Sequence, residues 1–273
     1  MPIFKKRPRL ALEDHEALIV ARSFQLPGSV STNAQLQQLS LQMHTTNSHV
    51  PISRWAIDTT KNISASYGSF MRDEQLLFDH TTFGISALEA KSMDPQQASL
   101  LGVGYSTLHK SYGIKNTSAA SKVALSRSDI GVVVGVQVSG HRGSSKPNAF
   151  SATGTSASIT AGRFSYALGL IGPCYSVDTA CSSALAALHI CVNTVTVQRE
   201  CTHGLAIGCS SLSEVLNMAT SVAGMLSLRG RCHTFDERAD GYCRGEGCAA
   251  FSVMSRHNAK NGPSVSILGS AVQ

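Results

Sequence analysis

The 273-residue sequence has few charged side chains and no long apolar run. Charged residues make up only 15% of it, against 42% hydrophobic residues, which excludes a highly charged disordered chain. No stretch approaches the roughly 18 consecutive apolar residues of a membrane span, so we expect none. Eight prolines and 23 glycines exclude collagen-like and low-complexity classes. At about 150 residues per domain, the length suits one large or two small globular domains.

The basic charge is concentrated near the start of the chain. Four basic residues lie within residues 5–9, so the net charge of +6 falls to +2 for the remainder. A nucleic-acid-binding protein usually carries basic and aromatic side chains over a folded face, so we expect no nucleic-acid partner. The run could be a nuclear localisation signal. We favour a solvated N-terminal arm or linker over residues 1–16.

The sequence shows neither a secretory signal nor a metal-binding pattern. Acidic residues, among them Glu13 and Asp14, follow the basic run where a signal peptide would have an apolar segment. We therefore expect a cytoplasmic location, with a plastid left open. The eight cysteines lie between Cys174 and Cys248 without a C-x-x-C pair, which argues against zinc. We expect reduced thiols, mostly buried as small hydrophobic side chains.

Hydrophobic patterning predicts strands that alternate with helices. The segment 94–113 has a helical spacing that opens on Asp-Pro and ends at glycine. Residues 130–136 are apolar at every position, as in a strand that is covered on both faces. Further strands are predicted at 17–21, 175–177, 204–208, 249–254 and 264–272. Together these elements predict a layered α/β fold.

Cys181 lies where a predicted strand turns sharply into a predicted helix. Residues 178–180 form the corner, and apolar residues then recur at helical spacing on one face that we expect to be buried: Ala184, Leu185, Leu188, Cys191, Val192 and Val195. The unpaired N–H groups and the positive dipole end of a helix N-terminus favour a thiolate. A tight corner also presents the side chain to a substrate, as in a nucleophile elbow. From these residues alone, Cys181 is a candidate nucleophile, and a structural cysteine remains the alternative.

The corner sequence VDTACSSAL (177–185) resembles the active-site segment of β-ketoacyl synthases, most closely the ketosynthase domains of type I modular polyketide synthases. Other segments resemble that family in the same order along the chain: 83–86, 93–97, 152–155, 161–166, 230–236 and 240–247. The resemblance runs from about residue 17 to the end. It implies a thiolase-like fold with αβαβα layers, of which the C-terminal half would be missing here.

The resemblance also implies a reaction. Cys181 would accept an acyl group as a thioester from an acyl carrier protein, with its backbone N–H contributing to the oxyanion hole. The family then decarboxylates a malonyl-type unit, and the resulting carbanion forms a carbon–carbon bond. No cofactor would be bound, because the carrier protein brings the phosphopantetheine thioester. Relatives are homodimers, and residues 150–180 resemble the part near their two-fold interface.

Two histidine motifs that the family uses for decarboxylation are absent from the sequence. We expect His189 to pack within the helix that follows Cys181, and His141, His203 and His233 to be surface or loop residues. Residues 17–273 would then be the N-terminal part of a synthase domain truncated at its C-terminus. This chain alone could at best be acylated at Cys181 and would not condense.

Several alternatives remain open at this stage. Asp236, Asp240, Arg244 and Glu246 have spacings that could suit catalysis, but we favour a structural ion network. A thiolase-fold enzyme acting on coenzyme A thioesters is a second enzyme hypothesis. A catalytically inactive ketosynthase-like subunit that dimerises or docks the carrier protein is the non-enzyme hypothesis. The absent histidines favour that last hypothesis, whereas the presence of Cys181 opposes it.

Overall fold

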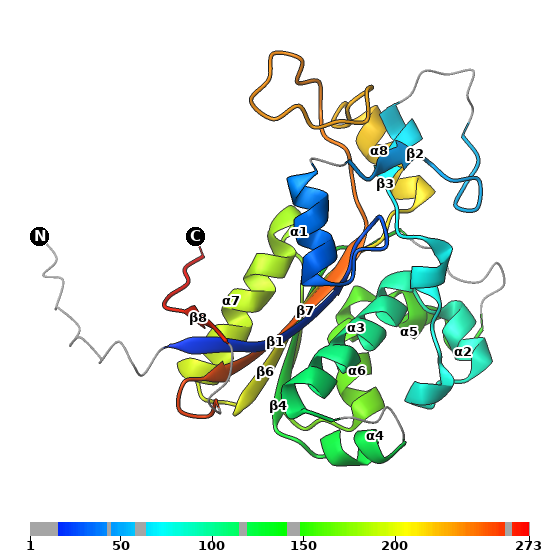
Figure 1. Cartoon of the computed structure of the whole chain (residues 1–273). Helices are drawn as coiled ribbons and strands as arrows, with labels where there is room; N and C mark the ends of the chain where they lie inside the picture. Colours follow the sequence, from blue (N-terminus) through cyan, green and yellow to red (C-terminus); the bar gives the residue numbers. More distant parts are fainter. Residues whose placement is uncertain are drawn as a thin grey trace, which may run out of the picture.

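A six-stranded mixed sheet forms the centre of the chain (Figure 1). The computed structural model describes residues 16–42, 45–57, 64–114, 119–140, 148–259 and 264–272. The strand order is β5-β4-β6-β7-β1-β8. The strands are β1 (Ala17–Gln25), β4 (Ile130–Val136), β5 (Cys174–Val177), β6 (His203–Ser210), β7 (Gly247–Ser255) and β8 (Val265–Ile267). β4 pairs in parallel with β5 and β6, and the other pairs are antiparallel.

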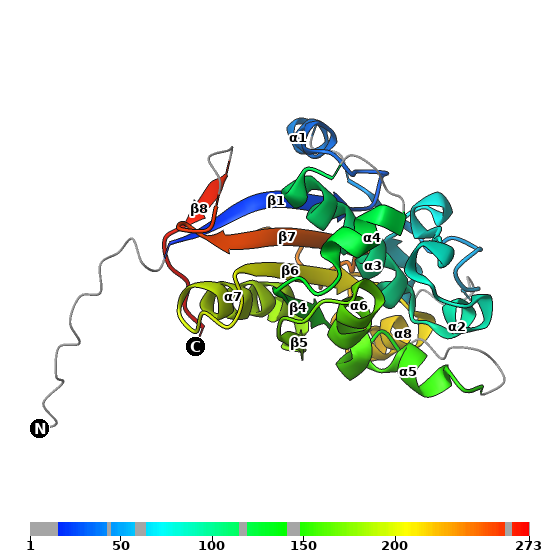
Figure 2. The ribbon, with the colours of Figure 1, turned by 90° about the horizontal axis from the view of Figure 1, so that it is seen from below.

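Helices cover both faces of this sheet, as Figures 1 and 2 show. α3 (Pro95–Tyr112) and α6 (Thr160–Leu168) pack on one face and α7 (Ser183–Thr196) packs on the other. β4 explains the arrangement, because its side chains alternate between the two faces. Val132 and Val134 join the core with α3 and α6, while Val133 joins the core with α7. The predicted layered α/β fold is therefore confirmed.

Shorter elements surround the sheet. A two-stranded ribbon of β2 (Asn47–His49) and β3 (Tyr67–Ser69) lies near α8 (Glu214–Val222). The other α-helices are α1 (Asn33–Leu41), α2 (Ala87–Ser92), α4 (Ala119–Leu125) and α5 (Ser151–Thr155). The 3-10 turns are η2 (Ser64–Ser66), η3 (Asp73–Leu76), η4 (Thr81–Phe83), η5 (Ala157–Ile159) and η6 (Ala180–Ser182). Within the described ranges, no helix is both long and apolar enough to cross a bilayer.

α3 shows how local sequence sets an element's limits. Asp94 caps the helix by accepting the Gln96 N–H at 2.8 Å, with Pro95 in the first turn, where the missing N–H costs nothing. Gly113 ends the helix in the left-handed region at φ 62°. The prediction for 94–113 is confirmed at both ends.

Two expectations about secondary structure and packing are wrong. The strand predicted over 264–272 is shorter in the structure. Only Val265–Ile267 pair with β1, so the strand ends at Ile267. The buried face of α7 also differs from the predicted set of residues, because Leu185 is 72% exposed. The helix meets the sheet through Ala187, Cys191 and Val192, whereas Leu185 borders an open cavity beside β6 and β7. The arm predicted over residues 1–16 and His141 lie outside the described residues, apart from Glu16.

His203 is buried, so the prediction of a surface or loop position is wrong. It is the first residue of β6 and is 2% exposed. Its Nδ1 lies 2.9 Å from the Tyr112 hydroxyl and its Nε2 lies 2.5 Å from Ser252 Oγ. Burial lowers the pKa of His203 from 6.5 to about 4. The folded protein therefore holds this imidazole neutral.

The buried neutral His203 should make the fold sensitive to acid. Below pH 6.5 the unfolded chain protonates this histidine while the folded chain does not, so stability is lost as pH falls from about 6.5 towards about 4. We expect His203 to account for about 2 to 3 kcal/mol of that loss. Urea unfolding at pH 7.5 and 4.5 measures it, with His203→Gln as the non-titrating comparison. An equal pH dependence in both proteins would show that His203 does not contribute.

Candidate active site

Cys181 lies in the turn η6, between the end of β5 and the start of α7. The helix begins at Ser183, two residues later than the sequence predicts. Ala180 precedes the cysteine with φ 56°, a conformation that alanine rarely adopts and that costs about 1 to 3 kcal/mol. The corner is therefore a strained turn that holds the Cys181 side chain out from the sheet.

Hydrogen bonds hold this turn in place. Asp178 Oδ1 accepts the Ala180 N–H at 2.9 Å. The hydroxyl of Ser183 accepts the Thr179 N–H at 2.8 Å and donates to the Ala180 carbonyl at 2.7 Å. The strained residue is thus bonded through both its N–H and its C=O, which offsets the cost of its conformation.

Two glycines bring the start of α7 unusually close to the sheet. A Cβ on Gly135 of β4 would lie 2.3 Å from the Ser183 carbonyl oxygen. A Cβ on Gly208 of β6 would lie 2.6 Å from the Ala184 Cβ. Any larger residue would push the first turn of the helix outward. The position of Cys181 therefore depends on these glycines, which sequence reasoning did not identify.

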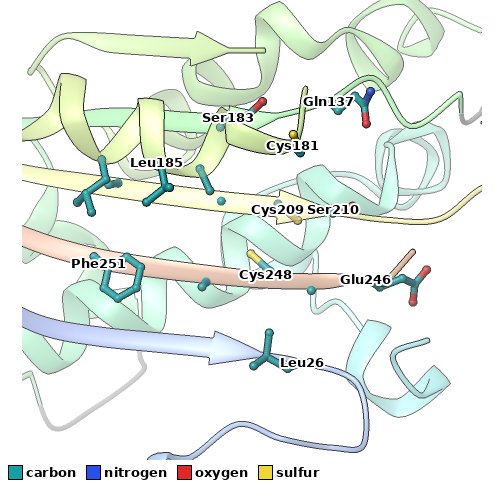
Figure 3. Close-up of a pocket in the computed structure, with 18 of the residues that line it drawn as sticks. Leu26, Gln137, Cys181, Ser183, Leu185, Cys209, Ser210, Glu246, Cys248 and Phe251 are labelled. Atoms are coloured by element: carbon teal, nitrogen blue, oxygen red, sulfur yellow. The ribbon is translucent and has the colours of Figure 1, made fainter. Parts of the chain in front are cut away.

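A cavity of 440 Å³ opens beside Cys181, between α7 and strands β6 and β7 (Figure 3). Its lining is mostly apolar, including Leu26, Leu185 and Phe251, with Gln137 and Glu246 at the end near the cysteine. Cys181 is exposed and lines this space. A thiol that borders an open apolar cavity is accessible to a small molecule that enters it.

Glu246 fixes the backbone that borders this cavity. Its side chain is 0% exposed and accepts hydrogen bonds from the Met71 N–H at 2.8 Å and the Leu212 N–H at 3.1 Å. Arg54 binds both carboxylate oxygens, at 3.2 and 2.9 Å. The predicted structural role is confirmed for Glu246. Sequence reasoning missed Arg54, which is 192 residues away along the chain.

The other acidic residues of that region lie away from the cavity lining. Asp236 pairs with Arg238 at 2.6 Å, and Asp240 accepts a hydrogen bond from Ser227 at 2.6 Å. Both stabilise the loop 227–243 locally. Arg244 is half-buried, and burial lowers its pKa. Asp236 and Asp240 therefore have separate partners instead of belonging to the ion network that we predicted.

The segment 94–97 (DPQQ) supports the same end of the sheet from the opposite face. Gln96 Nε2 donates to the Gln137 carbonyl at 3.0 Å, directly after β4, and Gln97 Nε2 donates to the Thr153 carbonyl at 3.1 Å. Ser139 donates to Asp94 Oδ2 at 2.5 Å. This segment therefore positions backbone that carries Gln137 into the cavity lining.

The cysteines differ strongly in exposure. Cys191, Cys201, Cys209 and Cys248 are buried, as expected, and all eight thiols are free. Cys209 faces Cys248 across β6 and β7, and a hydrogen bond between them together with burial raises the pKa of Cys209. Cys174 and Cys232 are exposed and Cys243 is half-buried, so four of the seven thiols outside the site are buried. Among the exposed cysteines, only Cys181 lines the cavity.

No described histidine lines the cavity at Cys181. His189 packs on α7, as predicted, with its Nδ1 2.9 Å from Ser270 Oγ and its Nε2 2.9 Å from Asn193 Nδ2. His233 is a half-buried loop residue with φ 43°. In the part of the chain that the structure describes, no three His, Cys, Asp or Glu side chains are grouped so as to hold a metal ion.

A family model described as "Beta-ketoacyl synthase, N-terminal domain" matches residues 15–259. The chain belongs to the β-ketoacyl synthase family. Among curated relatives, it is 37% identical to the non-reducing polyketide synthase mapC of Penicillium brevicompactum, over 98% of this chain and 11% of that protein. It is 36% identical to the non-reducing polyketide synthase olcA of Penicillium canescens, over 85% of this chain and 10% of that protein. The predicted resemblance to polyketide synthases is confirmed.

Solved ketosynthases show the same fold. The ketosynthase from module 6 of the bacillaene synthase of Bacillus subtilis 168 matches with a TM-score of 0.74 and 28% identity, over 89% of this chain and 40% of that one. The oxazolomycin ketosynthase domain from Streptomyces albus JA3453 matches with a TM-score of 0.74 and 26% identity, over 89% and 44%. The predicted thiolase-like fold is confirmed. This ketosynthase-family chain spans less than half of the length of these solved relatives.

Proposed function

We propose that this chain contributes the acyl-accepting part of a polyketide-synthase ketosynthase, with Cys181 as the nucleophile. The observation that most directly supports this proposal is the exposed Cys181 thiol, which lies at a strained corner beside a 440 Å³ apolar cavity. The substrate is an acyl group carried as a phosphopantetheine thioester on an acyl carrier protein. Polyketide synthases among the relatives support this substrate class.

The proposed loading step is a thioester exchange. The Cys181 thiolate attacks the acyl carbonyl carbon, and the new carbon–sulfur bond forms as the bond to the pantetheine sulfur breaks. The carrier's sulfur leaves and takes up a proton, so no external oxidant or reductant is needed. The Cys181 N–H donates to the oxyanion, and the nearby N-terminus of α7 adds positive potential. The carrier protein supplies the phosphopantetheine.

We also propose that residues 17–273 form the first part of a larger ketosynthase domain. Leu185 of α7 is 72% exposed and borders the open cavity, which leaves apolar surface uncovered there. The rest of a ketosynthase domain would cover it and supply the decarboxylating histidines. The solved ketosynthases, of which this chain spans 40% and 44%, support this arrangement.

The edge of the sheet formed by β5 is a suitable surface for contact between two copies of the domain in a homodimer. β5 is the terminal strand of the sheet, and it exposes Cys174 and Tyr175. α6 contacts β5 and exposes Tyr166. An edge strand with unpaired backbone groups is a natural template for pairing with a second copy. We therefore place the two-fold contact of the complete domain at this edge.

Loading and condensation can be separated experimentally. The purified 273-residue chain is incubated with an acyl-carrier thioester and a malonyl-carrier thioester, and both protein and products are analysed by mass spectrometry. We expect an acyl adduct on the chain and no extended product, because the cavity lining holds no described histidine and both family histidine motifs are absent from the sequence. Absence of the adduct would contradict the proposed acyl-accepting role. Formation of a new carbon–carbon bond would show that these residues suffice for condensation.

A further inference from the structure

A second pair of thiols lies outside the cavity at Cys181. The Cys243 N–H points at the sulfur of Cys232, with 3.5 Å between nitrogen and sulfur. With an N–Cα bond of about 1.46 Å, that sulfur is within about 5 Å of the Cys243 Cα. The contact therefore places the Cys232 sulfur beside the Cys243 backbone, which makes these two thiols close neighbours.

The two cysteines differ in accessibility. Cys232 is exposed, whereas Cys243 is half-buried. Burial, with a smaller contribution from the neighbouring Cys232, raises the pKa of Cys243 to about 11. Cys232 is therefore the thiol that meets a dissolved reagent first, and Cys243 is its close intramolecular partner.

The thiols lie at the neck of an exposed loop tip. Residues 233–242 between them include Phe235, which is fully exposed with φ 61°. Within this tip, the Asp236–Arg238 pair and the Asp236 N–H to His233 carbonyl bond at 3.0 Å are local contacts. Asp240, also within the tip, accepts a hydrogen bond from Ser227 outside it. A covalent link between Cys232 and Cys243 would close the tip at its neck.

We propose that Cys232 and Cys243 form a redox-responsive dithiol site, which a glutathione-class disulfide oxidises to an intramolecular disulfide. The Cys232 thiolate attacks one sulfur of the glutathione disulfide, which forms a mixed disulfide and releases one glutathione thiolate. The Cys243 thiolate then attacks the Cys232 sulfur and expels the second glutathione. The two cysteines lose two electrons and two protons, and the reagent becomes two molecules of reduced glutathione. This site is independent of the acyl-transfer proposal.

Trypsin separates the two thiols conveniently. Cleavage after Arg231, Arg238 and Arg244 places Cys232 in peptide 232–238 and Cys243 in peptide 239–244. The native chain is treated with oxidised glutathione, its remaining thiols are blocked, and it is digested without reductant. We expect the two peptides to be recovered as one disulfide-linked product, at least tenfold more abundant than glutathione-modified peptide 232–238. Dithiothreitol should separate them.

Variants test the order of the two steps. Cys243→Ser removes the resolving thiol, so Cys232 should accumulate as the glutathione mixed disulfide. Cys174→Ser removes an exposed thiol elsewhere and should leave the linked peptides unchanged. The proposal is overturned if wild-type Cys232 stays glutathionylated, pairs with another cysteine, or remains free while Cys174 reacts. The linked product from native wild-type protein supports it without relying on the fold of any variant.

Discussion

Replacing Cys181 with alanine is expected to lower the rate of acyl loading by at least about a thousandfold. The other exposed thiols, Cys174 and Cys232, do not line the cavity, so neither can substitute at the same position. The rate is measured as the appearance of acylated protein by intact mass spectrometry, with an acyl-phosphopantetheine thioester as the donor. The side chain loses only one sulfur atom from an exposed site, so the fold should be unchanged.

Two matched variants control this experiment. Cys174→Ala and Cys232→Ala each remove an exposed thiol and should load at the wild-type rate. Far-ultraviolet circular dichroism checks that all three variants retain the same secondary structure. Loading that persists in Cys181→Ala but falls in either control would place the nucleophile elsewhere on the chain.

Substitution of Gly135 by alanine should have the second large effect. The added Cβ would lie 2.3 Å from the Ser183 carbonyl oxygen, a backbone atom that can move only if the start of α7 moves. We expect a loss of about 2 to 3 kcal/mol in the free energy of unfolding. We also expect slower loading, because Cys181 immediately precedes the displaced helix. Urea denaturation and the loading assay measure the two effects.

Gly102 provides the matched comparison. It lies within α3, and apart from its chain neighbours and the backbone of its own helix, no atom is within 4 Å of the position that its Cβ would occupy. Gly102→Ala should therefore stabilise the protein by about 0.5 to 1 kcal/mol and leave loading unchanged. If both variants behave alike, the close approach of α7 to β4 does not position the nucleophile.

Features set by neighbouring residues could be predicted from the sequence. The limits of α3 follow from Asp94, Pro95 and Gly113, which act on the helix within a few residues. β4 is identified by apolar residues at every position, because both of its faces are covered. The corner at Cys181 is likewise a local strand-to-helix transition. Its motif also carried the family resemblance, which the family match over residues 15–259 confirms.

Features that depend on distant residues could not be predicted. His203 looks like a surface histidine in sequence, but it is buried because Tyr112 and Ser252 come from α3 and β7 to bond both ring nitrogens. Apolar spacing marks Leu185 as a core residue, although it borders an open cavity and is 72% exposed. Periodicity describes a helix face but not the surface that the helix meets.

The candidate site also combines a feature that is set locally with features that depend on distant residues. Cys181 could be chosen from its local setting, whereas Arg54 and Gly135 could not. Arg54 reaches Glu246 from 192 residues away, and Gly135 matters only because α7 lies against it. The backbone bordering the cavity therefore depends on pairings that a single sequence does not reveal. The role of Cys181 as the acyl acceptor remains the central proposal.

Mapping the acyl group on the wild-type chain tests that proposal most directly. The chain is loaded from an acyl-phosphopantetheine thioester, digested at neutral pH and sequenced by tandem mass spectrometry. No lysine or arginine lies between Arg163 and Arg199, so trypsin leaves Cys174, Cys181 and Cys191 on one peptide and fragment ions must assign the modification. We expect the acyl group on Cys181. Its attachment to Cys174, to Cys232 or to no cysteine would contradict the proposed site.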